Sequence, residues 1–265
     1  MLFLKRKELG SYIQKKIRTW FDGVGAVFIV MKILVLITAR GGSKRVPGKN
    51  IKELGGKPLI LWSIGVAKGI TDICDILVST DDQLIAEVAR DAGVLVPWLR
   101  PAELSHDTSS SVDVALHALN WYERKNGLVD GLLLLQPTSP FRSRETVTRG
   151  LNMFKENRAC SVIGVSPAES HPMWCFRVND NKMEPFIDDG GLQIRSQDLP
   201  LAYVVNGAFY LVDPNVLRVN KSFYNEGMRP LIMDQPAEAV DIDTEWDWKV
   251  AEASLMVEII PNSHR

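Results

Sequence analysis

The feature that most constrains this chain of 265 residues is an aliphatic run leading straight into a basic, glycine-rich loop. Ile33–Ile37 holds five consecutive aliphatic residues, which is typical of a strand buried on both faces of a sheet. The segment 37–51 then reads ITARGGSKRVPGKNI, with three glycines and one proline. Its four cations are Arg40, Lys44, Arg45 and Lys49.

Such a loop suits the binding of phosphate groups. Glycine lets the backbone approach a ligand closely and expose its N–H groups, and the cations neutralise oxyanions. The carboxyl end of a first parallel strand is also where an α/β sheet holds phosphate. The loop is neither a GxxxxGK[ST] motif nor a GxGxxG turn. A solvated basic surface loop remains the alternative.

Strand and helix patterns alternate after this loop. The expected strands are 32–39, 75–80, 131–135 and 159–165, and the expected helices are 58–69, 81–92, 109–124 and 144–154. We place Pro58 in the first turn of its helix, because proline needs no hydrogen-bond partner there. This alternation predicts a mostly parallel sheet covered by helices on both faces.

The alternation then breaks at an excursion over residues 167–203. Two short apolar segments, 173–178 and 182–187, flank Asn179–Asn181 and predict a β-hairpin inserted into the main fold. A strand over 207–212 and a closing helix over 244–256 complete the pattern. We therefore expect one domain over 31–265, with residues 1–30 as an extension outside the core. Met31 would then be the natural start of translation.

Composition excludes some classes of protein. A formal net charge of -1 gives no reason to expect nucleic acid or an anionic membrane as a partner. The apolar stretch after Val24 is interrupted by Lys32 and Thr38, so we expect no transmembrane helix. Three cysteines without paired spacing favour buried free thiols in a reducing cytoplasm.

Two polar clusters are placed where strands and helices meet. The first is Gln136–Arg142, whose two prolines fix the exit from a strand and leave the side chains of Gln136 and Arg142 available to a ligand. The second holds Asp241 and Asp243, which alternation puts on the same side of an extended segment. Two such carboxylates suit Mg²⁺ with phosphate oxygens as further ligands. The alternative is that Asp243 simply caps the last helix, for which Thr244 is the other candidate N-cap.

Six motifs, in order over about residues 31–255, resemble the CMP-sialic acid synthetases, the cytidylyltransferases that activate sialic acids and related nonulosonic acids. They are ARGGSKRVPGKN at 39–50, VSTDD at 78–82, LRPAELSHDTSS at 99–110, QPTSPFR at 136–142, NGAFY at 206–210 and DIDTEWD at 241–247. The resemblance implies a Rossmann-like nucleotidyltransferase fold and a homodimer whose inserted hairpin reaches the neighbour's site. It also implies a reaction of CTP with a nonulosonic acid that gives the CMP-sugar and pyrophosphate.

The resemblance also assigns roles to single residues. The implied CTP-binding residues are Arg40, Gly41, Ser43, Lys44, Lys49, Asn50, Arg100 and Ser111. The implied sugar-binding residues are Gln136, Thr138, Ser139, Arg195 and Asn206. Asp241 and Asp243 would bind Mg²⁺ and, with Arg40 and Lys49, would act in catalysis.

Three positions depart from the pattern of family members that act on N-acetylneuraminate. Val204, Trp174 and Ser196 stand where those members tend to have cations, although Arg195 is adjacent to the last. We therefore expect a different nonulosonic acid, such as a legionaminic-type sugar. The alternatives are a cytidylyltransferase for 3-deoxy-manno-octulosonate, and a module that binds CTP without turning it over.

Overall fold

The computed structural model describes residues 30–256, except 107, 158–159 and 188–189. The chain divides into two units, 1–30 and 31–265, and everything below concerns the second. The predicted N-terminal extension lies outside the described residues. No helix in the described part is long and apolar enough to span a membrane.

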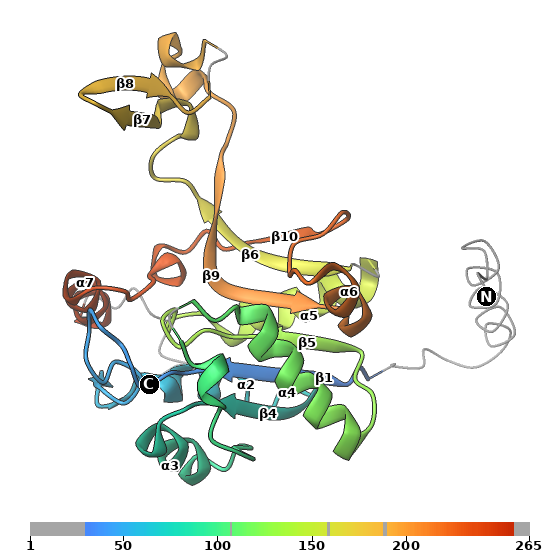
Figure 1. Cartoon of the computed structure of the whole chain (residues 1–265). Coiled ribbons are helices and arrows are strands. Elements are labelled where there is room, and N and C mark those ends of the chain that lie inside the picture. The colour runs from blue at the N-terminus through green and yellow to red at the C-terminus, as the bar shows by residue number, and fades with distance from the viewer. Residues whose placement is uncertain (1–29, 107, 158–159, 188–189, 257–265) are drawn as a thin grey trace, which may run out of the picture. The chain divides into compact units, whose positions relative to one another are not determined.

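A six-stranded sheet forms the centre of the unit, in the order β10-β6-β9-β5-β1-β4 (Figure 1). Its strands are β1 (Ile33–Thr38), β4 (Ile73–Ser79), β5 (Gly131–Leu134), β6 (Ser161–Pro167), β9 (Tyr203–Val212) and β10 (Arg229–Ile232). Every neighbouring pair is parallel except the two that involve β9, which runs antiparallel to both β5 and β6. The predicted mostly parallel sheet is confirmed.

Helices cover both faces of this sheet. They are α2 (Ile60–Ala67), α3 (Gln83–Asp91), α4 (Ser111–Asn126), α5 (Arg144–Asn157) and α6 (Pro214–Asn220), whereas α7 (Glu245–Met256) packs beside them. Alternate side chains of β1 explain the two layers: Ile33, Val35 and Ile37 pack with α2, α3 and α5, whereas Leu34 and Leu36 pack with α4 and α6. A third apolar cluster joins α7 to the segment around Leu54.

Within the described residues, the short elements are two small hairpins and five 3₁₀ turns. The hairpin strands are β2 (Glu53–Leu54) with β3 (Lys57–Pro58), and β7 (Phe176–Asn179) with β8 (Lys182–Pro185). The 3₁₀ turns are η1 (Ala102–Leu104), η2 (Pro172–Trp174), η3 (Gly191–Gln193), η4 (Ser196–Asp198) and η5 (Pro236–Ala239). Asp180 and Asn181 both have positive φ, as a two-residue hairpin turn requires, so the predicted inserted hairpin is confirmed.

Two local predictions are wrong. Pro58 lies in β3, where its ring precedes α2 by two residues, because the chain first forms the tight β2–β3 hairpin through Gly55 and Gly56. The cysteines are free as expected, but Cys74 and Cys175 are exposed instead of buried.

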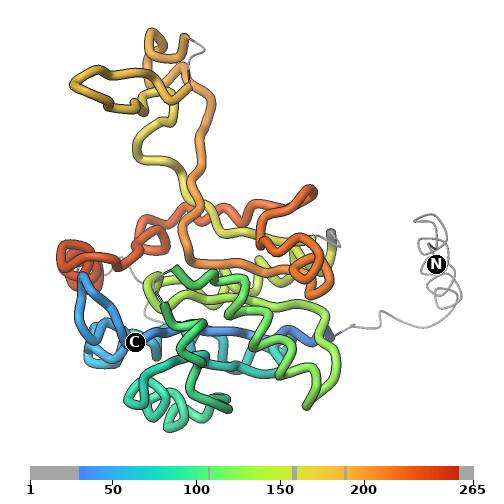
Figure 2. The backbone as a smooth tube through the Cα atoms, in the orientation of Figure 1, coloured from blue at the N-terminus to red at the C-terminus, as the bar shows by residue number. Residues whose placement is uncertain are grey.

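The excursion, which we call the inserted arm (residues 167–203), begins and ends at one edge of the sheet. Because β9 is antiparallel to β6, the end of β6 and the start of β9 lie side by side, with Pro167 paired with Tyr203. Figures 1 and 2 show the chain leaving through β6 and returning through β9. The same edge receives the carboxyl ends of β1, β4 and β5, since all of these are parallel to β6 within the sheet.

A bulge interrupts β9 at this edge. Ile163 of β6 pairs with Tyr210 and Val165 pairs with Val205, so Gly164 alone faces residues 206–209 of β9. Gly207 adopts φ +75° within the bulge, a conformation that side-chain-bearing residues rarely take. The bulge therefore turns the Asn206–Gly207 segment out of the regular ladder and towards the end of β5.

Candidate active site

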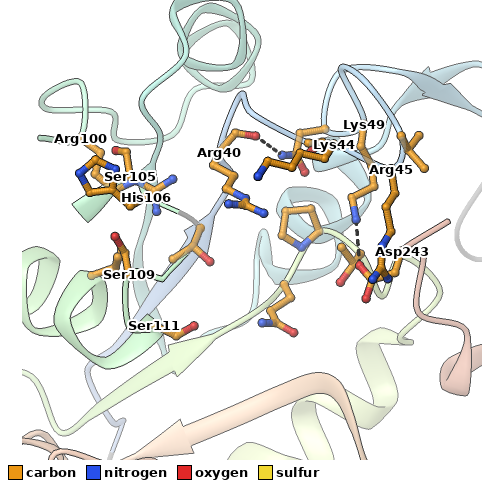
Figure 3. Close-up of a pocket in the computed structure, with 18 of the residues that line it drawn as sticks. Arg40, Lys44, Arg45, Lys49, Arg100, Ser105, His106, Ser109, Ser111 and Asp243 are labelled. Atoms are coloured by element: carbon orange, nitrogen blue, oxygen red, sulfur yellow. Dashed lines mark hydrogen bonds and ion pairs between the residues drawn. The ribbon is translucent and has the colours of Figure 1, made fainter. Parts of the chain in front are cut away.

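A cavity of about 490 Å³ lies at the carboxyl edge of the sheet, where the loops after β1 and β5 meet the segment before α4. Figure 3 shows two sets of polar side chains around it, with Arg40, Lys44 and Lys49 on one side and Arg100, Ser109 and Ser111 on the other. The predicted basic loop and the polar run before α4, which is the LRPAELSHDTSS motif at 99–110, are thus brought together in space. Parallel strands explain this, because their carboxyl ends open at a common edge.

The basic loop is held in place by its own polar groups. Asn50 Nδ2 donates to the carbonyl of Arg40 at 2.9 Å, and the carbonyl of Asn50 accepts from Ile60 N at 2.9 Å. Gly41 N donates to Asp81 Oδ1 at 3.0 Å. A Cβ on Gly41 would lie 2.5 Å from Asp82 Oδ2, so only glycine fits there. Arg40, Ser43, Lys44, Lys49 and Asn50 line the cavity as predicted.

The opposite wall is formed by Arg100 and the start of α4. Arg100 is buried, with Nη2 at 3.5 Å from Asp81 Oδ1, and its backbone N–H donates to the carbonyl of Thr80 at 2.6 Å. Burial lowers the pKa of Arg100, and the charge of Asp81 partly offsets this. Ser110 caps α4 by accepting from Val112 N at 3.1 Å. Ser111 is the first residue of α4 and lines the cavity.

Lys49 connects the basic loop to the acidic segment. Its Nζ donates to the carbonyl of Ile242 at 2.5 Å and to Asp243 Oδ1 at 3.1 Å (Figure 3). Lys49 is 9% exposed, whereas the side chain of Asp243 is 60% exposed and faces the cavity. A buried lysine bonded to a carboxylate at the rim places opposite charges at one point of the site.

The capping alternative for Asp243 is wrong. Thr244, the other predicted cap, is the N-cap of α7: its carbonyl accepts from Trp248 N at 3.0 Å, and its hydroxyl accepts from Asp247 N at 3.2 Å. Asp247 Oδ2 reaches back to Asp243 N at 3.0 Å and Thr244 N at 2.7 Å. Thr244 and Asp247 thus form a reciprocal capping pair, which leaves the carboxylate of Asp243 to Lys49.

Asp241 lies beside the bulge in β9. Ile242 is fully buried between the two aspartates, as their predicted alternation requires, and its N–H donates to the carbonyl of Thr138 at 2.8 Å. A Cβ added to Gly207 would lie 3.8 Å from Asp241 Oδ2. Burial raises the pKa of Asp241, the Thr138 hydroxyl lowers it through a hydrogen bond, and the charge of Asp243 raises it again.

The carboxylates of Asp241 and Asp243 fit Mg²⁺ only if a ligand or water supplies further oxygen atoms. In the described part of the chain, no group of three or more His, Cys, Asp or Glu residues is arranged to hold a metal ion. Two carboxylates on one extended segment supply hard oxygen ligands, and Mg²⁺ commonly completes its shell with phosphate oxygens and water. A bound triphosphate would supply those oxygens.

The residues predicted for the sugar are divided between different places. Gln136 and Thr138 line the cavity, whereas Ser139 is buried behind it. Asn206 is turned inward: its Nδ2 donates to Ser166 Oγ at 3.0 Å, and its Oδ1 accepts from Ala208 N at 3.1 Å. Asn206 therefore orders the bulge of β9. Arg195 lies in the inserted arm, where its Nε bonds Asp198 Oδ2 at 2.7 Å.

The expectation that Arg142 is available to a ligand is wrong. Its side chain is fully buried and bonds Ser63 and the carbonyl of Gln136. Arg45 lines the cavity with the other cations of the basic loop, as predicted. Sequence reasoning assigned no role to Thr38, Ser105, His106 and Ser109, which also line it. The last three belong to the polar run before α4, so their shared loop was the signal that could have identified them.

Comparison with known proteins identifies the family to which the chain belongs. A family model described as cytidylyltransferase matches residues 34–245. The chain belongs to the cytidylyltransferase family. It is 40% identical, over 226 residues, to a CMP-N,N'-diacetyllegionaminic acid synthase of Legionella pneumophila, covering 84% of this chain and 95% of that protein. It is also 36% identical to a pseudaminic acid cytidylyltransferase of Campylobacter jejuni, over 68% of this chain and 78% of that one.

The fold of this cytidylyltransferase is also found among solved structures. A CMP:2-keto-3-deoxy-manno-octonic acid synthetase complexed with CTP superposes with a TM-score of 0.63, over 86% of this chain and 99% of that one. At 17% identity, this likeness concerns the fold alone. It supports the nucleotidyltransferase-like α/β architecture predicted from the sequence.

Proposed function

We propose that this cytidylyltransferase couples CTP to a nonulosonic acid, giving the CMP-sugar and pyrophosphate. The observation that carries the proposal is the contact of Lys49 with Asp243, which joins the basic loop to the acidic segment at one cavity. A triphosphate needs cations along its oxygens and a counter-charge where bonds change. The relatives named above are a legionaminic acid synthase and a pseudaminic acid cytidylyltransferase.

In this reaction the anomeric hydroxyl oxygen of the sugar attacks the α-phosphorus of CTP. The bond from the α-phosphorus to the bridging oxygen breaks, pyrophosphate leaves, and the hydroxyl proton is released. Arg40, Lys44 and Lys49 would hold the phosphates, and Arg100 with Ser111 would hold the cytidine end. No covalent enzyme intermediate is needed, which suits a cavity rich in positioning groups.

We extend the proposal to a divalent cation held by Asp241 and Asp243. When bound, Mg²⁺ would stabilise negative charge on the phosphates as the bond to pyrophosphate breaks. The residues of the chain prepare for it: Lys49 orients Asp243, and the contact of Ile242 with Thr138 fixes the segment that carries both carboxylates.

The substrate we propose is a legionaminic-type sugar in preference to N-acetylneuraminate. Val204 is exposed on β9, and Trp174 and Ser196 lie in η2 and η4 of the inserted arm, so these positions offer no cation to the sugar. The relative at 40% identity makes a CMP-legionaminic acid.

The test is pyrophosphate release with CTP, Mg²⁺ and a panel of sugar acids. The panel holds N,N'-diacetyllegionaminate, a pseudaminic-type acid, N-acetylneuraminate and 3-deoxy-manno-octulosonate. We expect the largest kcat/KM with the legionaminic-type acid. A clear preference for N-acetylneuraminate would contradict the proposed specificity. CTP binding without turnover of any sugar acid would contradict the proposal that the protein catalyses this reaction.

We also propose that the active form is a homodimer built through the inserted arm. The arm and the start of β9 expose large apolar side chains, among them Leu201 at 85%, Phe186 at 57% and Val204 at 53%. Exposed apolar surface of this kind marks an interaction site, and a second copy would also bring its Arg195 near a neighbour. Sedimentation of Leu201→Asp beside the unmodified protein tests this, and an unmodified protein that sediments as a monomer would refute it.

Finally, we propose a cytoplasmic location for the protein. Its three cysteines are free thiols, which suits a reducing compartment. Fractionation of cells that express a tagged chain tests this proposal.

A further inference from the structure

Arg142 is a buried charge that the chemistry described above does not use. It follows β5 and is 1% exposed, which makes it one of the largest fully buried side chains of the described structure. A guanidinium out of water is costly unless other groups compensate for its charge and its donors. Burial lowers the pKa of Arg142 to about 9, while the charges of Asp241 and then Glu238 act to raise it.

The donors of Arg142 hold the main chain at the end of β5. Its Nη1 donates to Ser63 Oγ at 2.8 Å, and its Nη2 donates to the carbonyl of Gln136. Ser63 Oγ itself lies 3.3 Å from that same carbonyl. The peptide after Gln136 is therefore fixed from α2 and from Arg142 together, at the point where the chain leaves the sheet and enters the cavity wall.

This peptide decides where the Gln136 amide sits. Gln136 Oε1 lies 2.9 Å from the position that a Cβ on Gly207 would take, so the amide rests against the bulge of β9. The same glycine faces Asp241 Oδ2 at 3.8 Å from that position. Gly207 and Asp241 thus lie close to the amide of Gln136, which lines the cavity, and Arg142 is buried beneath the carbonyl of Gln136.

The charge of Arg142 acts on the acidic segment from within the protein. Glu238 is also buried, and its Oε1 accepts from Ser143 N at 2.8 Å. The charges of Asp241 and Glu238 both raise the pKa of Arg142, so Arg142 interacts electrostatically with these two carboxylates and offsets part of their negative charge. Without Arg142, the electrostatic potential at Asp241 would be more negative, and this part of the acidic segment would attract cations more strongly.

We propose that Arg142 is the positioning residue of the sugar end of the site, acting through the main chain of Gln136 and through its charge on the segment of Asp241. The inference rests on the proposed function, because it assigns Gln136 to the sugar. Two separable effects follow from it. The guanidinium fork, meaning the two Nη donors to Ser63 and to the Gln136 carbonyl, sets the position of Gln136. The positive charge of Arg142 sets the cation affinity of the acidic pair.

Three substitutions separate the fork from the charge. Arg142→Lys keeps the charge and loses the fork, Ser63→Ala loses one support of the Gln136 carbonyl at unchanged charge, and Arg142→Met loses both functions. Arg144→Met is the matched control, because Arg144 is exposed and bonds only weakly to the carbonyl of Gly65, at 3.4 Å. For each variant we would measure melting temperature, both KM values and kcat. Mn²⁺ binding to the protein without CTP, followed by electron paramagnetic resonance, gives a readout independent of turnover.

We expect Arg142→Lys and Ser63→Ala to raise KM for the sugar acid about tenfold while KM for CTP stays within about threefold, since a bond to a charged donor is lost. Their Mn²⁺ binding should match that of the unmodified protein. Arg142→Met should raise KM for the sugar and bind Mn²⁺ several-fold more tightly. If Arg142→Met does not fold, the first two variants still decide the effect of the fork.

The inference is overturned if the variants have lower melting temperatures and correspondingly lower kcat, yet keep both KM values and Mn²⁺ binding at the level of Arg144→Met. Arg142 would then be a structural residue. Failure of the proposed function is distinguishable, because the unmodified protein itself would release no pyrophosphate.

Discussion

Replacing Gly207 by alanine should damage catalysis far more than stability. The residue has φ +75°, and the added Cβ would lie 2.9 Å from Gln136 Oε1 and 3.6 Å from Ser139 Oγ. The left-handed conformation costs a residue with a Cβ about 1–2 kcal/mol. At 2.9 Å the contact is too short to persist, so either the Gln136 amide or the β9 bulge must move, and Asp241 lies at the same point.

A displacement of about 1 Å in a positioned active-site group can cost on the order of a hundredfold in rate. We therefore expect Gly207→Ala to lose about a hundredfold in kcat/KM for the sugar acid, with a melting temperature lower by only several degrees. Pyrophosphate release and thermal unfolding measure the two quantities.

Two other glycines serve as controls. Gly227 also has positive φ, +85°, but a Cβ there would meet nothing within 4 Å, and Gly65 lies in α2 with equally open space. Gly227→Ala should show the same backbone strain without loss of rate, and Gly65→Ala should be neutral or stabilising. If Gly207→Ala keeps kcat/KM within about threefold of the unmodified protein, the close approach of Gln136, Gly207 and Asp241 has no catalytic role.

Three further predictions concern the acidic segment and the start of the chain. Asp241→Asn and Asp243→Asn should each lower turnover about a hundredfold or more at nearly unchanged melting temperature, and Mg²⁺-saturable turnover near normal in both would argue against the metal role. Burial would raise the pKa of Asp247, but hydrogen bonds from the Thr244 hydroxyl and from the backbone lower this pKa overall. The ionised carboxylate therefore stabilises the folded protein fully above the pKa that Asp247 has in the unfolded chain. This stabilisation is lost as the pH falls through the pKa that Asp247 has in the folded protein. Asp247→Asn should therefore destabilise the protein at pH 7 by about 1 kcal/mol in denaturant unfolding, and this difference should shrink below about pH 4; a constant difference would contradict the assignment. A chain beginning at Met31 should fold and keep its turnover, which truncation followed by the pyrophosphate assay measures.

The main elements of the fold could be predicted from the sequence because its patterns are local. The aliphatic run of β1 predicts a buried strand, and the apolar periodicity of each amphipathic helix predicts a helix, from a few neighbouring residues. The bulge of β9 could not be predicted, because it depends on Gly164 of a distant strand facing residues 206–209. Pro58 was misplaced for a similar reason, since the β2–β3 hairpin competes with the helix start.

For the site, the sequence indicates which residues gather but not which way they point. Lys49, Arg100 and Gln136 line the cavity as predicted, because strand ends of a parallel sheet open together. Arg142 and Asn206 carry polar groups at equally suggestive positions, yet both are turned inward. Side-chain direction depends on three-dimensional packing, which motif spacing alone does not record.

The return of the inserted arm to its starting point has a consequence for how this protein can change. Because Pro167 and Tyr203 are paired neighbours, everything between them is a closed loop attached to an already formed ladder. The entropy of closing such a loop grows only slowly, by about 0.6 kcal/mol for each doubling of its length. The arm can therefore be lengthened, shortened or exchanged with little cost to the sheet, and a graft from a relative at these two residues should alter substrate choice while the nucleotide end stays intact.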